Sequence, residues 1–274
     1  MKRILTAVVF LPLFYFVNTH LPPVAFITFA LLCSLLAGWE LSRLARARGL
    51  TSHWVVNSAC ALLVCAAFAV PGELVPEGLS VPLLAVVLTS LALTLVYLFT
   101  CHDVGRYLET VATAMLSCTW VGLLIGFQVA LRLAEPPVRG DYLIYYLYII
   151  IWIGDAGALY TGRTLGRHKL APGLSPKKTV EGAVGSLVAS VLASLGVRAW
   201  FIPELGLFDA LALGVLLNVL GQLGDLTESG FKRSAGVKDS ASLIPGHGGI
   251  LDRGDSLLFT GPVLYYYYVF LIVG

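Results

Sequence analysis

Acidic residues lie at the ends of apolar segments, where they could bind a hard metal ion. Asp155 comes late in one apolar run, Asp225 and Glu228 follow another, and Asp252 and Asp255 precede the last. Carboxylate oxygens suit Mg²⁺, which keeps several waters and often binds substrate phosphates as well. We therefore predict a site for magnesium, with or without a second cation, whose ligands come from Asp155, Asp225, Asp252 and Asp255.

Basic residues share two polar stretches with these acids. Gly162–Gly182 reads GRTLGRHKLAPGLSPKKTVEG, and Gly224–Asp255 reads GDLTESGFKRSAGVKDSASLIPGHGGILDRGD. Interleaved acids and bases suit a metal-bridged polyphosphate, because the bases neutralise the phosphates while carboxylates hold the metal. The other interpretation is that the bases only follow the general excess of Lys and Arg in cytoplasmic loops. The candidate phosphate-binding side chains are Lys177, Lys178, Lys232, Arg233, Lys238 and Arg253.

A glycine-rich segment lies between Lys238-Asp239 and Asp252-Arg253, and it reads PGHGG from Pro245 to Gly249. Glycines permit positive φ and let backbone N–H groups approach an anion closely. His247 in this segment could contact a phosphate or a leaving group, and it could equally be a structural hydrogen-bonding residue. The segment is therefore a candidate phosphate-binding loop, with a flexible turn as the alternative.

The composition indicates a protein that lies in lipid. Apolar residues make up 58% of the 274 residues and charged residues only 12%, whereas soluble domains carry roughly 25% charged residues. So few charges cannot cover a surface that faces water, and lipid is the simplest other solvent. The net charge of +2 gives no indication of a nucleic-acid partner.

Nine apolar segments approach the roughly 20 residues that span a bilayer, and each is expected to be a helix because backbone groups in lipid must pair internally. They are Ile4–Asn18, Pro23–Trp39, Trp54–Val70, Val81–Thr100, Val111–Leu131, Tyr142–Tyr160, Ala183–Trp200, Leu207–Leu223 and Ser256–Val273. The first is short, and Pro22-Pro23 separates it from the second, so these two could instead form a tilted or partly re-entrant hairpin. The basic start resembles a signal peptide, but the lack of a small-residue cleavage site favours a retained first helix.

The distribution of Lys and Arg predicts the orientation. With the N-terminus inside, fifteen of the 18 basic residues lie on the cytoplasmic side and three, Arg132, Arg139 and Arg198, on the other. The expected fold is an all-α integral membrane protein, a polytopic bundle of about nine transmembrane helices with two long functional cytoplasmic loops. It would form one membrane domain over residues 1–274, with N-terminal helices in 1–100 and catalytic helices and loops in 101–274.

The run from Ser229 to Asp255 resembles the signature of the phosphatidate cytidylyltransferases, or CDP-diacylglycerol synthases. That pattern is S-x-apolar-K-R, four residues, K-D, then a spacer to H-G-G-apolar-x-D-R-apolar-D. The matching residues here are Ser229, Phe231, Lys232, Arg233, Lys238, Asp239, Pro245, His247, Gly248, Gly249, Ile250, Asp252, Arg253 and Asp255. Gly254 departs from the pattern, which usually has an apolar side chain there. GDAGALYTGRTLGRHKLAPGLSPKKTVEG also looks like the family, so the resemblance covers roughly the C-terminal half.

The resemblance implies that CTP and phosphatidate react, with magnesium, to give CDP-diacylglycerol and pyrophosphate. It implies a multi-pass protein of the cell inner membrane, in contact with membrane lipid, with its active site on the cytoplasmic side. The catalytic residues expected from it are Asp225, Lys232, Arg233, Lys238, Asp239, His247, Asp252 and Arg253. The substrate-binding residues are Lys177, Lys178, Ser229, Gly248 and Gly249.

Several alternatives stay open. Another CTP-using enzyme of membrane lipids, such as a polyprenol kinase, would release CDP instead of pyrophosphate. A transporter could use Asp155 and Asp225 as ion ligands. The small residues Gly185, Ala189 and Ala193 recur every four positions, which suits close helix packing within one chain or at the seam of a homodimer. The sequence leaves acyl-chain preference and the choice between CTP and dCTP undecided.

Overall fold

The fold is helical, as the sequence predicts. The computed structural model describes residues 12–74, 76, 78–241, 243 and 248–274. Within these residues, seven helices are long and apolar enough to cross a membrane, and α3 (Trp54–Ala67) is a shorter apolar helix. The expected all-α polytopic membrane fold is thereby confirmed. The first expected helix, Ile4–Asn18, lies mostly outside the described residues.

The chain divides into two compact units. Unit 1 combines Met1–Leu133 with Phe231–Arg253, and unit 2 combines Ala134–Gly230 with Gly254–Gly274. The chain therefore passes from unit 2 to unit 1 within α9 (Leu207–Ser234) and returns within α10 (Leu251–Tyr267).

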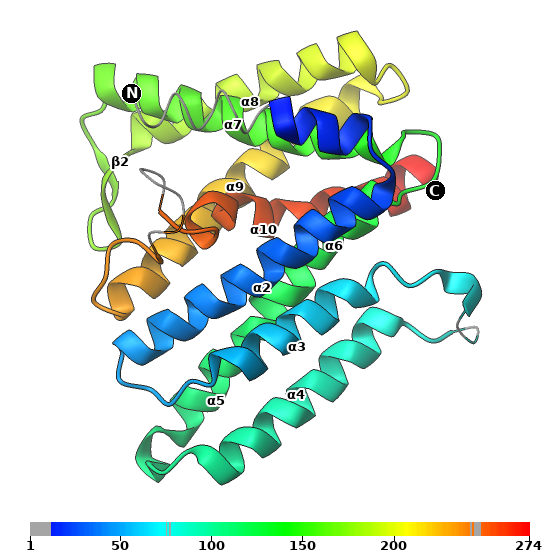
Figure 1. Ribbon diagram of the computed structural model, residues 1–274. Helices are drawn as coiled ribbons and strands as arrows, with labels where there is room; N and C mark the ends of the chain where they lie inside the picture. Colours follow the sequence, from blue (N-terminus) through cyan, green and yellow to red (C-terminus); the bar gives the residue numbers. More distant parts are fainter. Residues whose placement is uncertain (1–11, 75, 77, 242, 244–247) are drawn as a thin grey trace. The chain divides into compact units, whose positions relative to one another are not determined.

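Unit 1 contains α2 (Pro23–Ala47), α3, α4 (Val81–Thr100), α5 (Tyr107–Leu116) and α6 (Leu124–Arg132). A π-helical segment, Ser117–Leu123, joins α5 to α6. In Figure 1, α2, α3 and α4 lie side by side. The Tyr97 hydroxyl of α4 donates to Asn57 Oδ1 of α3 at 3.0 Å, and Asn57 Nδ2 donates to Ser42 Oγ of α2 at 3.0 Å. Buried hydrogen bonds thus fix the three helices against one another.

Unit 2 contains α7 (Gly140–Thr164), a two-stranded antiparallel hairpin, and α8 (Val180–Phe201). The hairpin strands are β1 (Lys169–Ala171) and β2 (Ser175–Thr179). Helices α7 and α8 run along each other (Figure 1). A side chain at Gly157 would be only 2.6 Å from the Ala189 Cβ and 2.9 Å from the Gly185 carbonyl oxygen. The small residues Gly185 and Ala189 therefore serve close packing within one chain, the first of the two predicted alternatives.

Helices α9 and α10, the latter followed by a π-helical segment Tyr268–Val273, supply the remaining spans. A buried polar network ties α9 to α8, because Asn218 Nδ2 donates to Ser186 Oγ at 2.7 Å and to Ser190 Oγ at 2.9 Å. Ser190 Oγ in turn donates to the Ile150 carbonyl oxygen of α7 at 3.0 Å. Polar groups inside lipid are satisfied here by neighbouring helices.

Two expectations about loops were wrong. The stretch Gly224–Asp255 was expected to be one long loop, but α9 continues to Ser234 and α10 begins at Leu251. A helix need not end where its apolar composition ends, and no proline interrupts the residues from Gly224 to Ser234. The stretch Gly162–Gly182 is ordered by a hairpin that the sequence did not indicate, so neither stretch is a plain loop.

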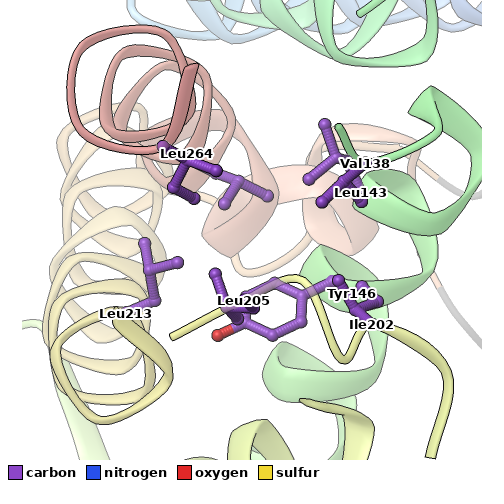
Figure 2. Close-up of a pocket in the computed structure, with 8 residues that line it drawn as sticks. Val138, Leu143, Tyr146, Ile202, Leu205, Leu213 and Leu264 are labelled. Atoms are coloured by element: carbon purple, nitrogen blue, oxygen red, sulfur yellow. The ribbon is translucent and has the colours of Figure 1, made fainter. Parts of the chain in front are cut away.

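An apolar cavity in unit 2 is too small to be a substrate site. Figure 2 shows Val138, Leu143, Leu213 and Leu264 among the side chains that surround it. Its volume is about 10 Å³, which is near the lower limit for a single water. The cavity reflects incomplete packing among apolar side chains, and the candidate chemistry lies elsewhere.

Candidate functional site

Four carboxylates gather in unit 2. Asp155 belongs to α7, Asp225 and Glu228 to α9, and Asp255 to α10. Asp255 lies within electrostatic range of the other three. Glu228 is 1% exposed, whereas Asp155 is exposed and Asp225 and Asp255 are partly exposed. Three helices therefore bring together acids that are separated by up to 100 positions in the sequence.

Lys178 contributes a positive charge to this cluster. Its Nζ lies 2.6 Å from Asp225 Oδ2, and both side chains are partly exposed. Successive residues of a strand point to opposite faces, so Lys178 turns toward the acids while its neighbour Lys177 is exposed. The structure thus brings together Lys178 and Asp225, two of the predicted site residues, and it does not place Lys177 in that contact.

The end of the hairpin is fixed by hydrogen bonds to the first turn of α8. Glu181 Oε2 accepts from the Arg167 N–H at 3.0 Å, and Glu181 Oε1 lies 2.6 Å from His168 Nδ1. Thr179 caps α8 by accepting from the Gly182 N–H at 3.1 Å. These contacts hold the strand that carries Lys178 at the start of a long helix.

In unit 1, Asp252 is a centre of hydrogen bonds in the first turn of α10. Its Oδ1 lies 2.5 Å from Lys232 Nζ, and its Oδ2 accepts from the Gly249 N–H at 2.8 Å. Oδ2 also accepts from the Ser240 N–H at 3.0 Å and lies 2.8 Å from Ser240 Oγ. The Lys232 and Asp252 side chains are only 11% and 6% exposed. Asp252 therefore anchors the segment that precedes α10.

The other predicted basic residues of unit 1 are accessible. Arg233, Lys238 and Arg253 are exposed, as is Asp239. Arg233 Nη1 donates to the Val237 carbonyl oxygen at 2.9 Å, which holds it near the end of α9. Long basic side chains at the surface can reach phosphate groups of a ligand.

The glycine-rich segment is described only in part. Gly248 has φ of +86°, a conformation that favours glycine. A side chain at Gly249 would overlap the Glu40 carboxylate and the Ser240 hydroxyl, so it would have to displace these two groups. Ser229, predicted to bind substrate, is 7% exposed. His247 lies outside the described residues.

The donor set suits magnesium by its chemistry. The four acids of unit 2 offer only hard oxygen ligands. As the side chains stand, no group of three or more His, Cys, Asp or Glu in the described ranges is arranged to hold a metal ion. Asp225 already forms an ion pair with Lys178. The cluster therefore fits a magnesium ion by ligand type, and Lys178 would compete with the ion for Asp225.

Sequence reasoning missed Glu40 of α2. This residue is fully buried and accepts from the Ile250 N–H at 2.7 Å and the Leu251 N–H at 2.8 Å. The apolar run was expected to end at Trp39, one residue before Glu40, but α2 continues to Ala47. An acid within a spanning helix is itself a signal of function, and that signal appears only once the longer helix is recognised.

The helices and these charged clusters define an integral membrane protein that carries grouped acidic and basic side chains at the ends of its helices. The sequence model of the Cytidylyltransferase family matches residues 1–271, and the chain belongs to this family. Similar proteins include the phosphatidate cytidylyltransferases of Staphylococcus saprophyticus subsp. saprophyticus, 44% identical over 153 residues, and of Staphylococcus haemolyticus, 42% identical over 154 residues. Each match covers 56% of this chain and 57% of the relative, so the chain spans little more than half the length of these curated relatives. The predicted family is confirmed.

Proposed function

We propose that this protein transfers the cytidylyl group of CTP to phosphatidate and releases pyrophosphate. The observation that carries the proposal is the cluster of four carboxylates in unit 2, with Lys178 2.6 Å from Asp225. Such a set of charges suits a magnesium-bound triphosphate. Relatives named phosphatidate cytidylyltransferase support the choice of substrates. The product is then CDP-diacylglycerol.

The reaction joins a phosphatidate oxygen to the α-phosphorus of CTP and breaks the bond from that phosphorus to the leaving pyrophosphate. A phosphomonoester has a second pKa of about 6, so the attacking oxygen is already largely ionised at neutral pH. A strong general base is therefore unnecessary, and positioning and charge neutralisation dominate. Lys232, Arg233, Lys238 and Arg253 neutralise phosphate charge, and Lys178 does so from the hairpin.

Asp225, Asp255 and Asp155, together with Glu228, would hold magnesium, which supplies electrophilic stabilisation of the phosphates when bound. We assign Asp252 to anchoring instead of the metal ligation predicted from the sequence, because its oxygens accept from Lys232, Ser240 and Gly249.

We propose that the polar helix ends face the cytoplasm, in the cell inner membrane. Fifteen of 18 basic residues lie on one side in the predicted topology, which supports this orientation. CTP is a cytosolic nucleotide and phosphatidate a lipid, so the reaction must take place at the depth of the headgroups. Protease digestion of sealed inside-out and right-side-out vesicles tests the orientation, and cleavage near Lys238 only in right-side-out vesicles would refute it.

The test uses the full chain purified in detergent with phosphatidate, Mg²⁺ and CTP labelled at the α-phosphate. Transfer of label into lipid with release of pyrophosphate is the expected result. An Asp225→Asn variant should lose at least tenfold in rate, whereas Glu204→Gln, an exposed acid of the same unit, should not. Release of CDP would favour a lipid kinase, and the absence of label in lipid from folded protein would exclude the synthase.

The metal assignment has its own test. A ligand that binds only the folded state stabilises it by about 2.7 kcal/mol when present at 100 times its dissociation constant. Mg²⁺ without CTP should therefore raise the unfolding temperature of the wild type and of Glu204→Gln. The same shift in Asp225→Asn would show that Mg²⁺ binds elsewhere.

A further inference from the structure

Glu40 is a buried acid that the proposed chemistry leaves without a role. It comes from α2, two hundred positions before the segment it contacts, and both of its carboxylate oxygens accept hydrogen bonds. Oε1 accepts from the Ile250 N–H at 2.7 Å. Oε2 accepts from the Leu251 N–H at 2.8 Å and from Ser240 Oγ at 2.9 Å. All of these residues belong to unit 1.

The N–H groups of Ile250 and Leu251 lie at the start of α10. The first N–H groups of a helix have no partner within the helix, and an anion there is favoured by the helix dipole. Glu40 therefore caps α10 from another helix. A carboxyl group with no exposed surface is tolerated because hydrogen bonds replace the lost water.

Ser240 links Glu40 to Asp252. Its hydroxyl lies 2.9 Å from Glu40 Oε2 and 2.8 Å from Asp252 Oδ2. Gly249 donates its N–H to Asp252 at 2.8 Å and has no room for a side chain beside Glu40. Two carboxylates thus contact Ser240, the first residue after Lys238-Asp239, and the three residues from Gly249 to Leu251 that precede Asp252.

We propose that Glu40 is a positioning residue for the signature segment that begins at Lys238. It fixes Ser240, Ile250 and Leu251 against α2 and thereby sets where Lys238 and Arg253 meet phosphates. This role rests on the proposed cytidylyl transfer. The contacts of Glu40 with Ser240, Ile250 and Leu251, called the tether below, do not depend on that proposal. The N-terminal helices would then support the chemistry as well as cross the membrane.

Glu40→Gln tests the tether while keeping the size of the side chain. The amide NH₂ of the new glutamine would face a backbone N–H group that donates a hydrogen bond to Glu40 in the wild type. One hydrogen bond is then lost, and two donors oppose each other. The matched control is Glu73→Gln, an exposed acid of the same unit. Ser240→Ala removes the link to Asp252 and should show a weaker effect in the same direction.

Hydrogen–deuterium exchange of peptides that contain Ile250 and Leu251 measures, without any substrate, how well the hydrogen bonds to Glu40 protect these amides. Exchange at least tenfold faster in Glu40→Gln than in the wild type and in Glu73→Gln is expected. In the transfer assay, kcat should fall at least tenfold and KM for CTP should rise at least fivefold. A purely structural loss would lower the folded fraction and leave KM for CTP unchanged.

The outcomes separate the two proposals. Unchanged exchange in Glu40→Gln would overturn the tether whether or not the wild type is active. Faster exchange with an unchanged KM for CTP would leave Glu40 a structural residue and overturn its positioning role. A wild type that transfers no label, yet shows faster exchange in Glu40→Gln, would overturn cytidylyl transfer and keep the tether.

Discussion

Removing the charge of Asp252 should destabilise unit 1 strongly. In Asp252→Asn the Lys232 ammonium, 11% exposed and 2.5 Å from the carboxylate in the wild type, loses the negative charge of Asp252 beside it. Breaking a buried pair by removing one member typically costs about 3–5 kcal/mol. At about 2–4 °C per kcal/mol for domains of this size, the unfolding temperature should fall by roughly 10 °C.

A double variant isolates the pair. In Lys232→Met with Asp252→Asn neither member of the pair carries a charge, and replacing both members of such a pair is often close to neutral. The double variant should therefore unfold at a higher temperature than Asp252→Asn alone, with a coupling energy of about 1–3 kcal/mol. Activity should stay low, because Lys232 is assigned to phosphate neutralisation.

Thermal unfolding in detergent, followed by intrinsic fluorescence, measures all four proteins of this cycle. Arg233→Met is the control, because it removes a neighbouring charge from an exposed position and should change stability by less than about 0.5 kcal/mol. Additive effects of the two single variants would refute the reasoning, since they would mean that Lys232 and Asp252 do not stabilise each other in the folded protein.

Three further predictions concern other contacts. Lys178→Met should lower the Mg²⁺ concentration for half-maximal binding about two- to fivefold, because a partly exposed ion pair contributes about 0.2–1 kcal/mol and the variant has no ammonium that competes with Mg²⁺ for Asp225. Lys177→Met should leave this concentration unchanged, and a Mg²⁺ titration without CTP measures both variants. Tyr97→Phe should lower stability by about 1–3 kcal/mol in thermal unfolding, since it leaves buried polar partners unsatisfied, with cytidylyl transfer retained. Gly157→Val should reduce the yield of folded protein on size-exclusion chromatography, because α7 and α8 touch at that position.

The sequence predicted the apolar spans well where polar residues closely bound them. The segment Val81–Thr100 was found as α4 with the same bounds, because Ser80 caps its start and the polar pair His102-Asp103 follows its end. Hydropathy failed at α9, which continues beyond Leu223. The residues from Gly224 to Ser234 are too polar to be predicted as part of a membrane span, but they can still form backbone hydrogen bonds within a helix.

Candidate site residues could be chosen from the sequence by their type, but the contacts between them could not be predicted. Lys178 and Asp225 were both chosen, yet only the register of the hairpin places Lys178 and not Lys177 on the carboxylate. The link from Glu40 to Leu251 joins positions 211 residues apart. Such a link depends on tertiary packing, which periodicity and composition along the chain do not encode.

The acids of the two units differ in what compensates their charge, and this difference sorts them by role. Asp252 and Glu40 accept backbone N–H groups on oxygens that also meet Ser240, so their hydrogen-bonding capacity is used by the protein itself. Asp255 instead lies among three further carboxylates, where each negative charge raises the cost of the others. A bound cation would stabilise a cluster of like negative charges most, because it reduces their repulsion. It would add little to an acid that is already surrounded by N–H donors. The same side chain, aspartate, therefore accepts hydrogen bonds from the protein in one unit, and in the other it lies where a cation would relieve the repulsion between like charges; this difference is the basis for proposing Asp255, and not Asp252, as a cation ligand.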